Sequence, residues 1–153
     1  MVPCGTGDRG RIEPDLVEHD RAAERSLLPF VRGGLSDAEV AFAREVQGFR
    51  GGAFEGVPTR SAPGIDGFLD GVPISLKEMK GGLGAVLKHA SKAEAQAANS
   101  GYKGVDLYIR APAVGRQPLL DFAGKGGLAK IPTQGTIRSI HVYTSDGWVP
   151  IGR

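Results

Sequence analysis

The sequence has little cysteine and no long apolar run. Its 153 residues include one cysteine, Cys4, so no disulfide within the chain can hold the fold together, and a zinc site built from several cysteines is excluded. No stretch approaches the roughly 20 apolar residues of a membrane span, and the first residues lack the charged-then-apolar plan of a signal peptide. We therefore expect a chain that works in water, without a membrane span, and with any export information outside it.

The composition predicts one globular domain of mixed secondary structure. Hydrophobic residues make up 41% and charged residues 24% of the chain, as in ordinary soluble proteins, while 24 glycines and 10 prolines indicate many turns and short elements. We expect residues 1–33 to be a linker and lead-in, with a short helix near residues 16–28, and residues 34–153 to form the domain. Basic character rises toward the C-terminus, where residues 111–153 hold five Lys or Arg against two Asp or Glu. Such an excess suits phosphates, and an ordinary solvated surface explains it equally well.

A first helix is predicted from Ser36 to about Gly48. Ser36 and Glu39 form an S-x-x-E capping box, and the apolar residues on either side of the cap fit a hydrophobic staple. At about 100° per residue, the apolar positions fall in one arc of about 60°, and Glu45 lies roughly 40° beyond its edge. Glu45 is therefore expected to border the buried face.

The segment from residue 64 to residue 79 predicts a tight hairpin. Asp70-Gly71 stands between two alternating runs and suits a two-residue type I′ turn, which needs positive φ at both positions. The register that follows pairs Leu69 with Val72, Phe68 with Pro73, Gly67 with Ile74, Asp66 with Ser75, and Ile65 with Leu76.

The two faces of this hairpin have different chemistry. Paired residues share a face and alternate along each strand, so five apolar side chains are expected to form a core face. They are Ile65, Leu69, Val72, Ile74 and Leu76. Asp66, Ser75 and Lys77 point the other way, away from the predicted core, and are expected to lie within a few ångströms of one another.

The remaining pattern completes a mixed central sheet flanked by helices, an α/β (α+β) fold. A helix is predicted over residues 83–100 and a strand over 105–110, parallel to the second hairpin strand because a helix connects them. Residues 111–135 are expected to be a long loop. A C-terminal β-hairpin follows over 136–144 and 148–151, turning at Asp146-Gly147.

The polar face suggests hydrolysis of a phosphodiester. That reaction needs a cation to neutralise charge on the phosphate, an activated water and a positive group near the developing oxyanion. Glu45 and Asp66 are the expected metal ligands, and Lys77 would orient or activate the water. Ser75 would hold a metal-bound water through its hydroxyl.

These residues, in this order, resemble the PD-(D/E)XK nuclease superfamily. A helix with Glu45 precedes Asp66 on one strand and Ser75-x-Lys77 on the next, followed by a helix and a strand. More narrowly, the order Glu, Asp, Ser, Lys is similar to C-terminal toxin domains of contact-dependent growth inhibition and other polymorphic toxins. Ser75 stands where the superfamily carries an acid, and glycine precedes the Asp motif in place of proline.

The resemblance covers residues 36–110 and implies a restriction-endonuclease-like core with Glu45, Asp66, Ser75 and Lys77 as catalytic residues. It further implies a divalent cofactor (Zn²⁺, Mg²⁺ or Mn²⁺), a DNA or transfer RNA substrate with DNA favoured, and a cognate immunity protein. The toxin would be secreted as part of a larger protein and delivered to the cytoplasm of a competitor cell. Basic residues near the motif and in the long loop are candidate nucleic-acid contacts: Lys80, Lys88, Arg116, Lys125 and Lys130.

Two other functions fit the same residues. One is a metal-independent ribonuclease that uses His141 or His89 with lysine and tyrosine residues of the final sheet. The other is a non-catalytic binding module, in which Asp66 and Lys77 form an ordinary solvated ion pair.

Overall fold

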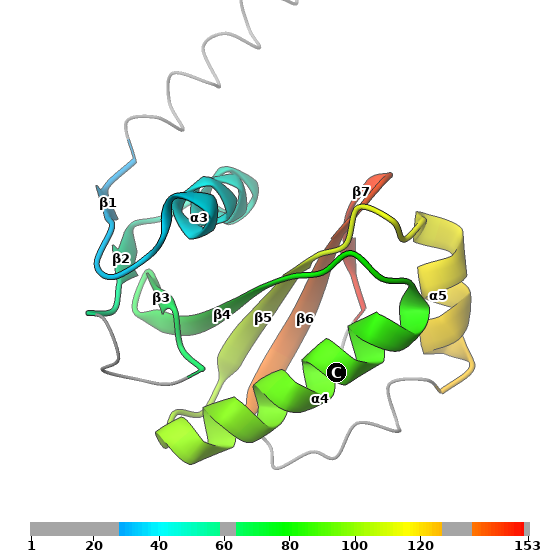
Figure 1. The fold of residues 1–153 in the computed structure, drawn as a ribbon. Coiled ribbons are helices and arrows are strands. Elements are labelled where there is room, and N and C mark those ends of the chain that lie inside the picture. The colour runs from blue at the N-terminus through cyan, green and yellow to red at the C-terminus, as the bar shows by residue number, and fades with distance from the viewer. Residues whose placement is uncertain (1–27, 59–63, 127–135, 152–153) are drawn as a thin grey trace, which may run out of the picture.

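Seven strands form one sheet, and helices lie against both of its faces (Figure 1). The computed structural model describes residues 28–58, 64–126 and 136–151. The helices are α3 (Asp37–Arg50), α4 (Leu83–Ser100) and α5 (Arg116–Gly124). The strands are β1 (Phe30–Val31), β2 (Phe54–Gly56), β3 (Gly67–Leu69), β4 (Val72–Glu78), β5 (Val105–Arg110), β6 (Ile137–Thr144) and β7 (Gly147–Pro150).

Sheet order follows chain order, from β1 to β7. Strands β4, β5 and β6 are mutually parallel, and α4 and α5 connect them in turn. Antiparallel pairs flank this centre, β2–β3–β4 on one side and β6–β7 on the other, while β1 pairs in parallel with β2. The predicted mixed sheet flanked by helices is confirmed at this level, including the parallel pairing of β4 with β5 and the C-terminal hairpin.

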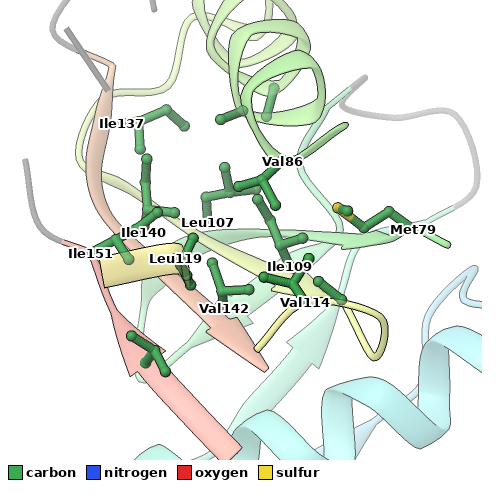
Figure 2. Packing of buried hydrophobic residues seen from close by; sticks show 14 of the residues in the cluster. Met79, Val86, Leu107, Ile109, Val114, Leu119, Ile137, Ile140, Val142 and Ile151 are labelled. Atoms are coloured by element: carbon green, nitrogen blue, oxygen red, sulfur yellow. The ribbon is translucent and has the colours of Figure 1, made fainter. Parts of the chain in front are cut away.

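The core has two halves, one on each face of the sheet. On the α4 face, small residues of the helix let it pack closely on the branched side chains of β5 and β6 (Figure 2). This α4-side core includes Val86, Ala90, Ala93, Leu107, Ile109, Ile140 and Val142. On the other face, α3 packs over the α3-side core, which includes Phe42, Val46, Phe54, Leu69, Ile74, Leu76 and Tyr108.

The prediction of a single core face on the hairpin was therefore wrong. Ile74 and Leu76 pack under α3, but Ser75 is fully buried and lies opposite Leu107 in register, on the α4 side. Ile65 belongs to the α4-side core and not with Leu69. The reason is that central parallel strands carry helices on both faces, so neither face of β4 is free for solvent.

The hairpin turn matches its prediction, but the ladder is shorter than expected. Asp70 and Gly71 have φ of 51° and 81°, as a type I′ turn requires. Three of the predicted pairs form, from Leu69↔Val72 to Gly67↔Ile74. The predicted pairs of Asp66 with Ser75 and of Ile65 with Leu76 do not form, because β3 begins only at Gly67. The backbone N–H of Asp66 still donates to the carbonyl of Ile74 at 2.9 Å.

Several elements differ from the sequence prediction. The predicted long loop contains α5, whose only buried helical residue is Leu119, so its apolar periodicity is weak. Part of the predicted lead-in is β1, whose Phe30 stacks on Phe54 of β2 at 4.8 Å between ring centroids. The proposed helix near residues 16–28 lies, except for its last residue, outside the described part of the chain.

The C-terminal turn lies one residue earlier than predicted. Thr144 pairs with Gly147, so Ser145 and Asp146 occupy the turn and Gly147 carries the positive φ of 103°. The Thr144 hydroxyl explains the shift, since it accepts from the Asp146 N–H at 3.0 Å and donates to the Gly147 carbonyl at 2.8 Å. Within the described ranges, no helix is both long and apolar enough to cross a bilayer.

Candidate active site at the edge of strand β4

Asp66 lies just before β3, beside the part of β4 that β3 does not pair with. On the β3 side of β4, strand pairing stops at Gly67↔Ile74, so the Leu76 N–H needs another acceptor. The Asp66 carboxylate supplies it, with Oδ2 accepting from the Leu76 N–H at 2.7 Å. Burial raises the pKa of Asp66, while this hydrogen bond and the charge of Lys77 act to lower it. The net upward direction marks a desolvated carboxylate.

Lys77 lies beside Asp66 and reaches α4. Its Nζ donates to Oε1 of Gln96 at 2.8 Å. Burial lowers the pKa of Lys77, the carboxylate of Asp66 raises it, and the neighbouring charge of Lys92 lowers it again. A half-buried lysine with a depressed pKa is better able to exchange a proton than an ordinary surface lysine.

The carboxylate that α3 brings toward this pair is Glu39. Its charge raises the pKa of both Asp66 and Lys77. Glu39 also completes the capping box of α3, where its Oε1 accepts from the Ser36 N–H at 2.8 Å. The S-x-x-E pattern predicts Glu39 as a cap residue alone, yet its charge also acts on Asp66 and Lys77.

Glu45 lies elsewhere, on the α3 face of the sheet. Its carboxylate forms an ion pair with Arg110 at the end of β5. Neither the Asp66 nor the Lys77 pKa responds to Glu45. The structure therefore does not bring Glu45 to Asp66 as a second metal ligand, because the inner face of α3 covers β5 while its first turn reaches β4.

Ser75 lies beneath the site and not in it. The residue is fully buried, and its Oγ has no hydrogen-bond partner among the described residues. A hydroxyl under α4 cannot hold a solvent-exposed water unless the helix moves. Asp66 and Lys77 are thus the two predicted catalytic residues that the structure brings together.

The predicted nucleic-acid contacts are spread over the surface. Lys80 follows β4, Lys88 lies on α4, and both are exposed. Arg116 begins α5, where its backbone N–H donates to Asp146, and Lys125 caps the end of that helix. Lys130 lies outside the described residues.

Of the two candidate histidines, His89 lies on α4 close enough to Lys77, Lys92 and Lys88 for their charges to act on it. Burial first, and then these three charges, lower its pKa. His89 therefore belongs to the surroundings of Lys77.

His141 lies on β6 within the α3 face and forms a separate cluster. It is 7% exposed, stacks on Tyr108 at 5.1 Å between ring centroids, and its Nε2 lies 3.2 Å from Oγ of Ser139. Burial lowers the pKa of His141, and the charges of Arg50 and Arg138 lower it further against the opposing effect of Asp106. These effects favour the neutral form of His141.

The comparisons with known proteins add no name to this arrangement. No family model, curated protein or solved structure matches the chain.

A divalent cation fits this site only in part. Across the described segments, no three His, Cys, Asp or Glu side chains form a group able to hold a metal. Asp66 offers one carboxylate with an oxygen already held by the Leu76 N–H, and Glu39 is the carboxylate on its α3 side. That donor set suits a hard cation such as Mg²⁺ or Mn²⁺, which takes one or two carboxylates and completes its shell with water and substrate phosphate.

Proposed function

We propose that the chain is a divalent-metal-dependent phosphodiester hydrolase, a toxin nuclease that acts on DNA rather than transfer RNA in a competitor bacterial cell. One observation carries the proposal. The Asp66 carboxylate is held by the Leu76 N–H at 2.7 Å and Lys77, the next residue of β4, is held by Gln96 at 2.8 Å, so two half-buried groups of opposite charge lie within electrostatic reach of each other, and burial shifts the pKa of each toward its neutral form. Pairs of groups shifted in this way are typical of sites that do acid–base or metal chemistry.

Each residue has a task that follows from its contacts. Asp66 is held by the backbone of β4 and would bind the cation, which supplies charge neutralisation at the phosphate. Lys77, held by Gln96, would orient the attacking water or accept its proton. Glu39 would contribute a second negative charge from α3, the part that the sequence had suggested for Glu45.

The element order also supports the proposal. A helix, α3, precedes Asp66 at the start of β3, Ser75 and Lys77 lie on β4, and α4 and the parallel strand β5 follow. This is the order on which the resemblance to the PD-(D/E)XK superfamily rests. A restriction-endonuclease-like core, delivery as part of a larger secreted toxin and a cognate immunity protein remain parts of the proposal.

The test is cleavage of plasmid DNA and of transfer RNA by the purified chain with Mg²⁺ or Mn²⁺. We expect excess chelator to stop cleavage and Asp66→Asn to lower the rate at least about 100-fold, the scale of losing a principal electrostatic group. Asp121→Asn is the matched control, because Asp121 is an exposed carboxylate on α5. Cleavage that continues in chelator, or that survives Asp66→Asn, would sink the proposal.

A metal-independent ribonuclease is the competing function, favoured by the cluster around His141. A neutral histidine beside Ser139, with Arg50 and Arg138 within electrostatic reach, has the groups that such chemistry uses. In that case His141→Ala would abolish cleavage of RNA in chelator while Asp66→Asn would not. A binding module without catalysis predicts that expression in bacteria without a partner gene is harmless.

A further inference from the structure

Three side chains of α4 form a row that leads to Lys77. His89, Lys92 and Gln96 are spaced three and four residues apart, so they fall within an arc of about 60° on the helix. The hydrogen bond from Lys77 Nζ to Gln96 at 2.8 Å fixes the direction of this arc toward the edge of β4. The backbone of Gly64 packs closely on Gln96, since an added Cβ at Gly64 would come within 2.6 Å of the Gln96 Cβ.

The positive charge of the row is that of Lys92, because Gln96 is uncharged and burial lowers the pKa of His89. Lys92 acts on the pKa of both Lys77 and His89, and the carboxylates that act on Lys77 are Asp66 and Glu39, below the row. Lys92 is exposed and His89 half-buried, so both can meet a ligand from solvent. An exposed lysine with a histidine and an amide beside it offers one charge and several hydrogen-bond donors along the helix, which suits the phosphate backbone of a polyanion.

We propose that the row of His89 and Lys92 on α4, anchored at Gln96, is the surface that binds the phosphate backbone of a nucleic acid and leads it to Asp66 and Lys77. This inference rests on the proposed nuclease function and extends it to how the substrate is held. It replaces the predicted contact at Lys88, which lies about 40° outside the arc. Lys88 acts on the pKa of His89 but not on that of Lys77.

The experiment measures binding apart from cleavage. A fluorescein-labelled duplex DNA is titrated with the full chain carrying Asp66→Asn, in excess chelator, at several salt concentrations. Three further variants each remove one positive charge: Lys92→Gln in the row, Lys88→Gln beside it, and Lys103→Gln in the turn after α4. Circular dichroism spectra check that each variant keeps its helix content.

Lys92→Gln is expected to weaken binding about fivefold and to reduce the salt dependence by about one phosphate contact. Lys103→Gln should leave both unchanged, and Lys88→Gln should have the smaller effect of the two helix variants. The inference is overturned if Lys88→Gln weakens binding as much as Lys92→Gln or more. It is also overturned if Lys92→Gln weakens binding no more than Lys103→Gln. The proposed function would still stand in that case if Asp66→Asn stops cleavage in the otherwise native chain. A chain that binds no duplex at all overturns the inference directly.

Discussion

At the scale of single residues, Glu39 and Glu45 of α3 have different roles: the charge of Glu39 acts on Asp66, while Glu45 forms an ion pair with Arg110. Glu39→Gln keeps the capping box, because glutamine can also accept from the Ser36 N–H, yet it removes the charge near Asp66. We expect Glu39→Gln to lower the cleavage rate about tenfold with little change in melting temperature. Glu45→Gln should instead leave cleavage within about twofold, because its partner is Arg110. Equal losses in the two variants would contradict this assignment.

Glu94 is a residue whose role is structural. It is 1% exposed on α4, and its carboxylate accepts from the backbone N–H groups of Thr136 and Ile137, both at 3.1 Å. Glu94→Ala would leave two buried donors without this acceptor, so we expect it to lower the free energy of unfolding by about 3 kcal/mol. Urea denaturation measures the loss, and Glu94→Gln, which keeps one carbonyl acceptor, should lose less. A change below about 1 kcal/mol in the alanine variant would show that the contact contributes little.

At the scale of elements, replacing glycine by alanine should lower stability in the β3–β4 turn and raise it at the start of α4. Gly71 has a φ of 81° in the turn, where a side chain is strained, so Gly71→Ala should cost about 1 kcal/mol of stability. Gly84 lies in α4 with open space around its Cβ position, and Gly84→Ala should add about 0.5 kcal/mol through helix propensity. Thermal unfolding of the two variants checks the signs. A stabilised Gly71→Ala variant would mean that the turn is not of the type described.

The turn matters for the site as well as for stability. It aligns β3 with β4 so that the ladder begins at Gly67, and Asp66, the residue before it, accepts from the Leu76 N–H with its carboxylate. A turn of another length would flip the side chains of β3 to the opposite face. Placement of Asp66 is therefore a property of the hairpin and not of the aspartate alone.

At the scale of the whole molecule, His141 makes stability depend on pH. Burial lowers its pKa below the ordinary value of 6.5, so the unfolded chain binds a proton at a higher pH than the folded one. Its contribution to stability is present above about pH 6.5 and is lost as pH falls toward the depressed folded value. Asp66, whose folded pKa is raised, works in the opposite sense, because the folded chain binds its proton at a higher pH than the unfolded chain does.

We therefore expect the free energy of unfolding to decrease between about pH 7 and about pH 5. His141→Phe keeps the stacking on Tyr108 and removes the titrating group, so it should flatten this slope. His89→Gln is the matched control. The pKa of His89 is also lowered, but His89 is only half-buried, so its variant should keep most of the slope. Chemical denaturation at several pH values makes the comparison, and an unchanged slope in His141→Phe would refute the role.

Local signals were sufficient for much of the secondary structure. The capping box at Ser36 and Glu39, the positive-φ turn at Asp70-Gly71, and the apolar spacing of residues 83–100 act through neighbours in sequence, so their prediction succeeded. Elements that depend on distant partners were missed. β1 is two residues long and exists because β2 lies beside it, and α5 buries only Leu119. In both cases the stabilising contact is tertiary and leaves almost no periodic pattern.

By itself, the sequence determined the hairpin turn at Asp70-Gly71 and the register of the three pairs next to it, because turn type and alternation are local rules. Only the tertiary structure decided which groups meet near Asp66. Helices cover both faces of β4, so the face that the sequence pattern predicts to be exposed is buried, together with Ser75. Glu45 forms its ion pair with Arg110 and not with the site. The same packing brought Glu39, Gln96 and Lys92 toward the edge of β4. Which side chains meet depends on how helices cross a sheet, and that is set by the packing of the whole core.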